Sequence, residues 1–254
     1  MNQEFSLEKL QFQTETDRRS QTQNYDRRRN RNTVKLVRPK RIEDLPGEDQ
    51  FNRAVVNFLF FVVLFMNVLI NVDHGVFPAG SIAIKGALGV NNTEYGLLGS
   101  AVFFGLTIGS VAATFLYATC NTKYVLITVM FLNACSLLMF VMTNQYILLL
   151  LSRFLTGFFQ VFVSIYFPVW SDMFGATDSQ KQLWLTILLL SSTLGVLFGY
   201  IMTTQFIEKV TWQYSFYTQI FAVIPIILAL LFTPIKYLDL KLAAMIKAGY
   251  SPEE

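Results

Sequence analysis

The sequence predicts an all-α membrane protein in which six helices cross the bilayer and a disordered tail precedes the first of them. Hydrophobic residues make up 53% of the 254 residues and charged residues only 15%, whereas soluble domains carry about 25% charged residues. The charges are also uneven, since residues 1–53 hold 21 of the 37 and residues 54–237 hold only 11. One soluble core cannot bury that much apolar surface, so the composition excludes an ordinary cytosolic enzyme and a secreted disulfide scaffold.

Residues 1–50 form the first predicted region, a disordered basic tail in the cytosol. They are rich in Gln, Asn, Arg and Thr and lack hydrophobic periodicity, which is typical of disorder. A basic block near the end of this region consists of Arg27, Arg28, Arg29, Arg31, Lys35, Arg38, Lys40 and Arg41. Either it is a positive anchor on the cytosolic side of the first span, or it binds anionic lipid headgroups. Because the net charge of +3 comes from residues 1–53, and the rest of the chain is balanced, it does not indicate a nucleic-acid partner.

Six apolar segments follow and define a predicted transmembrane domain at 51–237. Each is close to the ~20 residues that a bilayer-spanning helix needs. They lie at about 54–76, 95–118, 124–142, 146–171, 183–206 and 213–235. The basic tail predicts a cytosolic N-terminus, and an even number of spans then returns the C-terminus to the cytosol. The last region, 238–254, begins with a pattern that predicts a short amphipathic helix on the cytosolic surface.

Motifs in the first five spans carry a resemblance to a known family. Span 1 ends with Asp73-His74-Gly75-Val76-Phe77-Pro78, and span 2 opens with Glu94-Tyr95-Gly96-Leu97-Leu98-Gly99-Ser100-Ala101. Span 4 contains Ser152-Arg153-Phe154-Leu155-Thr156-Gly157, and span 5 contains Gly195-Val196-Leu197-Phe198-Gly199-Tyr200. The stretch from about 50 to 237 resembles the N-terminal half of a major facilitator superfamily transporter. Its Asp-x-Gly after the first helix is similar to the Spinster-like branch, whose members usually have Asp-Arg there.

The resemblance implies a bundle of two inverted three-helix repeats, which is half of a 12-helix fold. It also implies a small or lipid-like substrate, bound between this half and either a second half or a second copy in a homodimer. The family carries a charged gating loop between spans 2 and 3, but the matching stretch here, 114–124, keeps only Lys123 as a charge. That departure favours a rival hypothesis, a transport-inactive membrane scaffold or subunit. A truncated gene product is a third interpretation.

Two charges deep in the apolar spans are the main candidates for function. Arg153 lies seven residues into span 4 and Asp73 lies 19 residues along span 1, so both fall in the outer half of the membrane and can form an ion pair. The resemblance links the matching acid and arginine to proton coupling, whereas the alternative is a fixed pair that joins two helices. His74, the only histidine, either shares a proton with Asp73 or is an interfacial residue.

Polar residues also recur along one face of two spans. Arg153, Gly157, Gln160 and Ser164 follow one another at spacings of 4, 3 and 4, and Asn67, Asn71 and His74 at spacings of 4 and 3, so each set shares a helix face. The predicted cavity-lining residues are Asn67, Asn71, Gly157, Gln160 and Ser164. The alternative is that these side chains join packed helices. Asp73 lies off the span-1 stripe.

Small residues and missing motifs complete the prediction. Gly105 and Gly109 in span 2, and Gly195 and Gly199 in span 5, are four residues apart and predict close helix packing. The sequence has no HExxH, nucleophile elbow, phosphate loop or Cys/His ligand cluster. It therefore predicts a multi-pass membrane protein in contact with the lipid bilayer, without cofactor, metal or enzymatic activity. Its predicted function is transport of a small or lipid-like solute, and the resemblance implies proton coupling.

Overall fold

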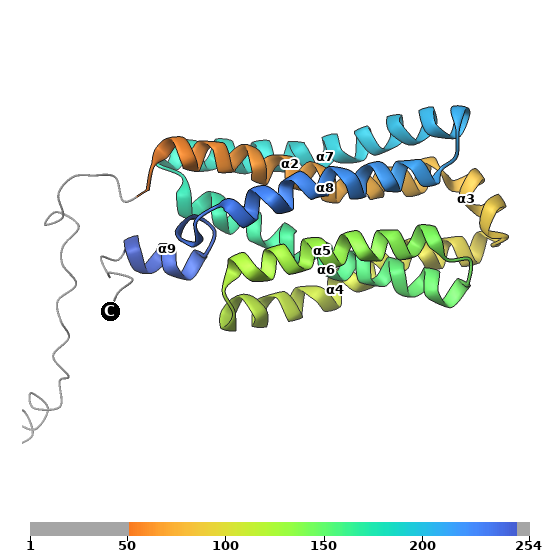
Figure 1. Ribbon diagram of the computed structural model, residues 1–254, viewed down its shortest axis with the longest axis horizontal. Helices are drawn as coiled ribbons and strands as arrows, with labels where there is room; N and C mark the ends of the chain where they lie inside the picture. Colours follow the sequence, from red (N-terminus) through yellow and green to blue (C-terminus); the bar gives the residue numbers. More distant parts are fainter. Residues whose placement is uncertain (1–50, 248–254) are drawn as a thin grey trace, which may run out of the picture. The chain divides into compact units, whose positions relative to one another are not determined.

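The computed structural model describes residues 51–247, which are helical almost throughout (Figure 1). The predicted disordered tail at 1–50, with its basic block, and the last part of the predicted C-terminal region, 248–254, lie outside the described residues. The helices are α2 (Arg53–Ala79), α3 (Ser81–Leu88), α4 (Asn92–Thr119), α5 (Thr122–Met142), α6 (Tyr146–Phe174), α7 (Asp178–Lys209), α8 (Gln213–Phe232), the 3₁₀ turn η2 (Ile235–Tyr237) and α9 (Leu240–Lys247). Six of them, α2 and α4 to α8, are long and apolar enough to cross a membrane.

The ends of the spans follow ordinary capping chemistry. Asn52, Asn121 and Thr177 each accept a hydrogen bond from a backbone N–H in the first turn of the helix that follows. Asn91 and Glu94 form a capping box at the start of α4, which satisfies two backbone N–H groups reciprocally. These polar caps place the breaks between spans within a few residues of the predicted positions.

Two elements differ from the sequence prediction. The first span continues through Gly75 and Pro78 to Ala79, because a proline in the last turn removes one hydrogen bond without stopping the helix. The connection after it, where no helix was predicted, contains the short helix α3. That helix ends at Leu88 and is capped by Gly89, whose φ of 67° lies in the left-handed region that favours glycine at a C-cap.

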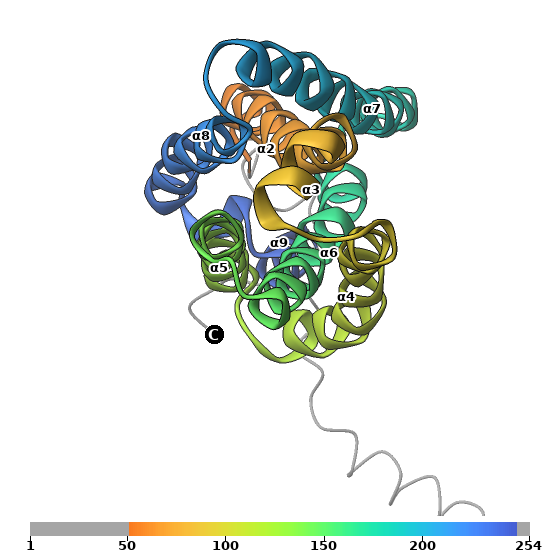
Figure 2. The ribbon, with the colours of Figure 1, turned by 90° about the vertical axis from the view of Figure 1, so that its right-hand side faces the viewer.

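The six spans form two inverted three-helix repeats, α2–α4–α5 and α6–α7–α8. The first helix of each repeat packs against the second helix of the other, α2 on α7 and α6 on α4, and these are the two most extensive helix contacts. The first helix of each repeat also packs against the third helix of the other, and the third helices, α5 and α8, contact each other. Figure 2 views this bundle from the end that carries α3 and shows α2 and α6 between the α5–α8 side and the α4–α7 side.

The opposite end, which we call the α9 end, is tied together by side chains that reach backbone carbonyls. Tyr166 and Trp170 of α6 donate to the carbonyls of Leu238 and Tyr237 at 3.0 and 2.9 Å. Lys123, in the first turn of α5, donates to the carbonyls of Leu231 and Thr233 at the end of α8. These contacts hold η2 and α9 against the bundle, where the start of α2 also lies (Figure 1).

Candidate functional site

A buried ion pair joins the two central helices near the α3 end. Asp73 lies on α2 and Arg153 on α6, with Arg153 Nη1 3.4 Å from Asp73 Oδ2. The exposed fractions of the two side chains are 0% and 2%. Asp73 is six residues from the end of α2 and Arg153 seven residues from the start of α6, so each lies roughly 10 Å along its helix from the same end of the bundle.

Gln160 is the third member of this site. It lies on α6, and its Nε2 donates to Asp73 Oδ1 at 2.6 Å and to the backbone carbonyl of Ile70 at 2.8 Å. Both oxygens of the carboxylate therefore have a donor from α6.

Two aromatic rings cover the guanidinium of Arg153. Its Cζ lies 4.4 Å from the centroid of the Phe77 ring and 5.4 Å from that of Phe140, within the range of a cation–π contact. Arg153 Nε is buried and has no hydrogen-bond partner among residues 51–247. In that part of the chain Asp73 is the one acidic partner of Arg153, so its carboxylate is the one negative charge that offsets the buried guanidinium.

His74 lies beside this pair but points elsewhere. Its ring stacks on Phe103 of α4, with centroids 6.0 Å apart and an interplanar angle of 24°. Within the described residues no hydrogen bond joins His74 to Asp73. Consecutive residues of an α-helix project about 100° apart, which explains why Asp73 faces α6 while His74 faces α4.

A polar pocket lies next to the ion pair, on its α9 side, between α2, α6 and α7. It has a volume of about 410 Å³. Its walls contain four polar residues (Asn67, Asn71, Ser164 and Ser192) and five apolar ones (Phe167, Pro168, Leu185, Leu188 and Leu189). Three of the five residues predicted to line a cavity are in this set.

The other two predicted lining residues lie inside the helix contacts. Gln160 is buried in the hydrogen bonds to Asp73, and a Cβ added to Gly157 would overlap the carbonyl oxygen of Val102 on α4. Position along one helix face brought these residues together in the prediction, but the face is shared between a pocket and a helix interface. Asn67 also joins helices, since its Nδ2 donates to the carbonyl of Leu188 and to Ser191 Oγ on α7.

The four small residues predicted to pack helices lie at the two most extensive interfaces. A Cβ on Gly105 would overlap Phe154 of α6, and one on Gly109 would lie 2.6 Å from the carbonyl oxygen of Phe158. Gly195 and Gly199 stand against the backbone of α2 in the same way, at Val68 and Val72. Gly75, which the spacing argument did not single out, meets the backbone of α7 at Val196 and Tyr200.

Gln219 is a further buried polar residue that the sequence argument missed. It lies on α8 with 2% of its surface exposed, and its Nε2 donates to the carbonyl of Leu69 at 2.8 Å. It therefore braces α2 one turn before Asp73. The available signal was its spacing of four from Ser215, also buried, which gives α8 a short polar stripe.

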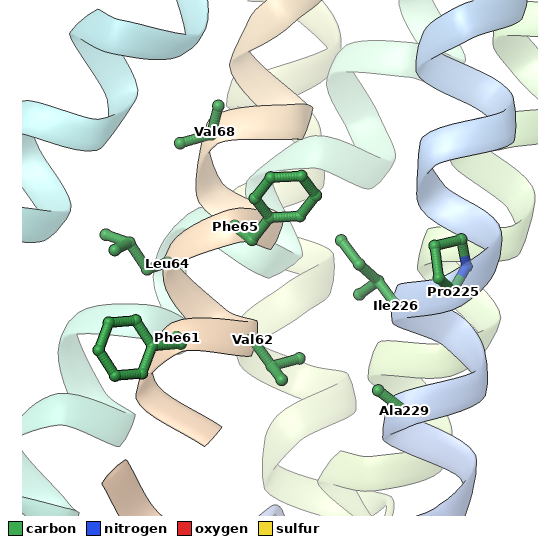
Figure 3. A pocket seen from close by; sticks show the side chains of 8 residues that line it. All are labelled: Phe61, Val62, Leu64, Phe65, Val68, Pro225, Ile226 and Ala229. Atoms are coloured by element: carbon green, nitrogen blue, oxygen red, sulfur yellow. The ribbon is translucent and has the colours of Figure 1, made fainter. Parts of the chain in front are cut away.

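A second pocket, between α2 and α8, differs in chemistry. It has a volume of about 440 Å³ and is lined by Phe61, Val62, Leu64, Phe65, Val68, Pro225, Ile226 and Ala229 (Figure 3). All eight side chains are apolar, and none belongs to the predicted site. Without a hydrogen-bonding side chain it cannot orient a polar ligand.

Comparison with known proteins agrees with this architecture. The family model described as Major Facilitator Superfamily matches residues 54–248, which include all six spans. A search of curated proteins gave no match. With six apolar helices in two inverted repeats and a family match over most of its length, the chain is a multi-pass integral membrane protein that belongs to the Major Facilitator Superfamily, a family of transporters.

Proposed function

We propose that the chain moves a small or lipid-like solute across a membrane and that Asp73, Arg153 and Gln160 couple this movement to protons. The observation that carries the proposal is the buried pair between the first helices of the two repeats, with Arg153 Nη1 3.4 Å from Asp73 Oδ2. Charged side chains inside membrane spans are rare and mark ion or proton pathways. The Asp-x-Gly at residues 73–75 supports placing the chain in the Spinster-like branch.

The coupling follows from the partners of the two charges. Protonation of Asp73 removes the negative charge that faces Arg153, so the guanidinium is left with aromatic rings and must find water or another acceptor. Because Asp73 belongs to α2 and Arg153 and Gln160 to α6, this change weakens a contact between the two repeats. The substrate is then bound on the face that carries the polar pocket, between this bundle and a second six-helix body. That body is either another half or a second copy of the chain.

The test is transport by the full chain in proteoliposomes, with and without an inward proton gradient. The probes are radiolabelled solutes that span sugars, amino acids and lysolipids. We expect at least one solute to accumulate faster with the gradient and Asp73→Asn to abolish that difference. Asp178→Asn is the matched control, because Asp178 is an exposed carboxylate in the first turn of α7. An unchanged gradient effect in both Asp73→Asn and Arg153→Ala would contradict the ion-pair mechanism.

A second candidate function is that of a transport-inactive membrane subunit. It is favoured by Lys123 at the start of α5, which is fixed by two backbone carbonyls at the end of α8 rather than free to form a latch. Such a subunit is expected to co-purify with one fixed partner in mild detergent. Transport by the isolated chain would exclude this role.

A further inference from the structure

We propose that the polar pocket between α2, α6 and α7 binds the head of a neutral, hydroxyl-bearing amphiphile. The inference rests on the proposed transport function and names the substrate class. The pocket has a volume of about 410 Å³, which falls in the range of roughly 300–1,000 Å³ that small-molecule sites occupy. Four of its nine lining residues are polar and none is charged.

Three of the four polar side chains of the pocket, those of Asn67, Asn71 and Ser164, already use their hydrogen-bond donors within the protein. Asn67 Nδ2 donates to the Leu188 carbonyl and to Ser191 Oγ, at 2.7 and 2.8 Å. Asn71 Nδ2 donates to the Asn67 carbonyl at 2.8 Å, and Ser164 Oγ donates to the Gln160 carbonyl at 3.3 Å. Ser192, the fourth polar residue of the wall, makes no side-chain hydrogen bond within residues 51–247. A ligand that needs several donors, such as a carboxylate or a phosphate, therefore finds only this hydroxyl.

The acceptors, in contrast, remain open. Asn71 Oδ1 has no hydrogen-bond partner within residues 51–247. Pro168 lies inside α6 and lacks the N–H that would bond to the carbonyl of Ser164 four residues earlier, and both residues line the pocket. Asn71 and Ser164 thus present acceptors from two helices, which suits a ligand that donates through hydroxyl groups.

The absence of charge in the walls selects a neutral head. A phosphate or an ammonium would be moved into an apolar setting without an opposite charge, which is unfavourable. The five apolar residues, among them Phe167 and Leu185, provide the surface for an apolar body. A monoacylglycerol combines the two parts.

The position of the pocket explains how a bound ligand can affect the ion pair. Asn71 lies two residues before Asp73, and Ser164 lies four residues after Gln160. The carbonyl of Gln160 accepts from Ser164 Oγ while its side chain donates to Asp73 Oδ1. A ligand that pulls on Ser164 therefore acts on the residue that holds the carboxylate.

The experiment is photolabelling of the full chain in nanodiscs by a diazirine-bearing monooleoylglycerol, with mass spectrometry to map the labelled residues. No proton gradient is applied, so binding and coupling are read separately. We expect labels around Asn71 and Ser164, and competition by unlabelled monooleoylglycerol. The same oleoyl chain on a phosphate head (oleoyl lysophosphatidic acid) or an amine head (oleylamine) is expected to compete at least tenfold more weakly. Equal competition by either charged lipid overturns the proposal.

Two variants make the test specific. Asn71→Leu removes one acceptor, and Pro168→Ala restores the N–H that occupies the Ser164 carbonyl without disturbing the helix. Each is expected to weaken competition by unlabelled monooleoylglycerol roughly 2- to 12-fold, the value of one hydrogen bond. Thr204→Ala is the control, because that exposed hydroxyl of α7 already bonds to the carbonyl of Tyr200.

Either proposal can fail alone. Proton-dependent transport that Asp73→Asn abolishes, together with labelling that both pocket variants leave unchanged, overturns only the substrate class. Labelling that the pocket variants weaken, together with a gradient effect that Asp73→Asn leaves unchanged, overturns only the proton coupling.

Discussion

Arg153 is held by one carboxylate and two aromatic rings at a place where water is scarce. Removing a charge from water in such a setting costs free energy. The attraction between the two partners offsets that cost only while both are charged, and the cost disappears only when both are absent. Gln160 adds a donor to Asp73 Oδ1, which keeps the carboxylate oriented toward α6. The site therefore responds strongly to the loss of either charge.

The first prediction separates the stability of this pair from its function. Asp73→Asn leaves a buried guanidinium without its carboxylate and is expected to destabilise the bundle by about 3–5 kcal/mol. Adding Arg153→Met removes the unpaired charge, so the double variant should unfold at a higher temperature than Asp73→Asn alone, although its transport stays lost. The measurement is the thermal unfolding midpoint in mild detergent.

A matched control comes from two charges at the α3 end. Glu208 and Lys209 are exposed, so Glu208→Gln and Lys209→Met should leave the midpoint unchanged. Additive effects in the Asp73 and Arg153 double variant would mean that the two side chains do not depend on each other.

At the scale of helices, the two repeats are joined where backbones touch. Gly105 of α4 and Gly157 of α6 bring their helices together, as Gly75 of α2 and Gly199 of α7 do in the other pair. Because lipid is as apolar as a leucine side chain, such contacts rather than hydrophobic burial hold membrane helices together.

The second prediction concerns these contacts. Gly105→Ala places a Cβ against the backbone of Phe154, and overpacking of this kind costs about 1–3 kcal/mol. Gly96→Ala, on the same helix, meets nothing within 4 Å and should be neutral or stabilise by up to about 1 kcal/mol through helix propensity. Unfolding midpoints of the two variants provide the comparison, and equal shifts would show that the α4–α6 contact is not close.

The sequence predicts some features of these helices and not others, because the spacing of residues along a helix carries only part of the information. Length and apolarity predict where each span lies, and depth along the helices places Asp73 and Arg153 at a similar level, where they can pair. Spacing tells which residues share a face but not which neighbour covers it. For that reason Gln160 was predicted beside a cavity and is found on Asp73, and Gln219, on a helix without a charged landmark, was missed.

At the scale of the whole bundle, residues 51–247, the basic residues differ between the two ends. The α9 end carries Arg53, Lys123, Lys181, Lys236, Lys241 and Lys247, and the α3 end carries Lys85 and Lys209. Basic residues gather on the cytosolic side of membrane proteins. The bundle should therefore lie with its α9 end, and both of its termini, in the cytosol.

The last prediction tests this orientation with thiols. Cys120 is exposed at the end of α4, on the α9 side, so it serves as the reporter in a Cys135→Ser background. Gly86→Cys reports the α3 end in a chain without the two native cysteines, because its new side chain meets no neighbour within 4 Å. A membrane-impermeant maleimide should label Cys120 only after the plasma membrane is opened, whether the protein lies at the cell surface or in an organelle. If the protein lies at the cell surface, the Gly86→Cys thiol should react in intact cells. If the protein lies in an organelle, that thiol should react only after all membranes are solubilised. Labelling of Cys120 in intact cells would reverse the orientation, and with it the side from which protons reach Asp73.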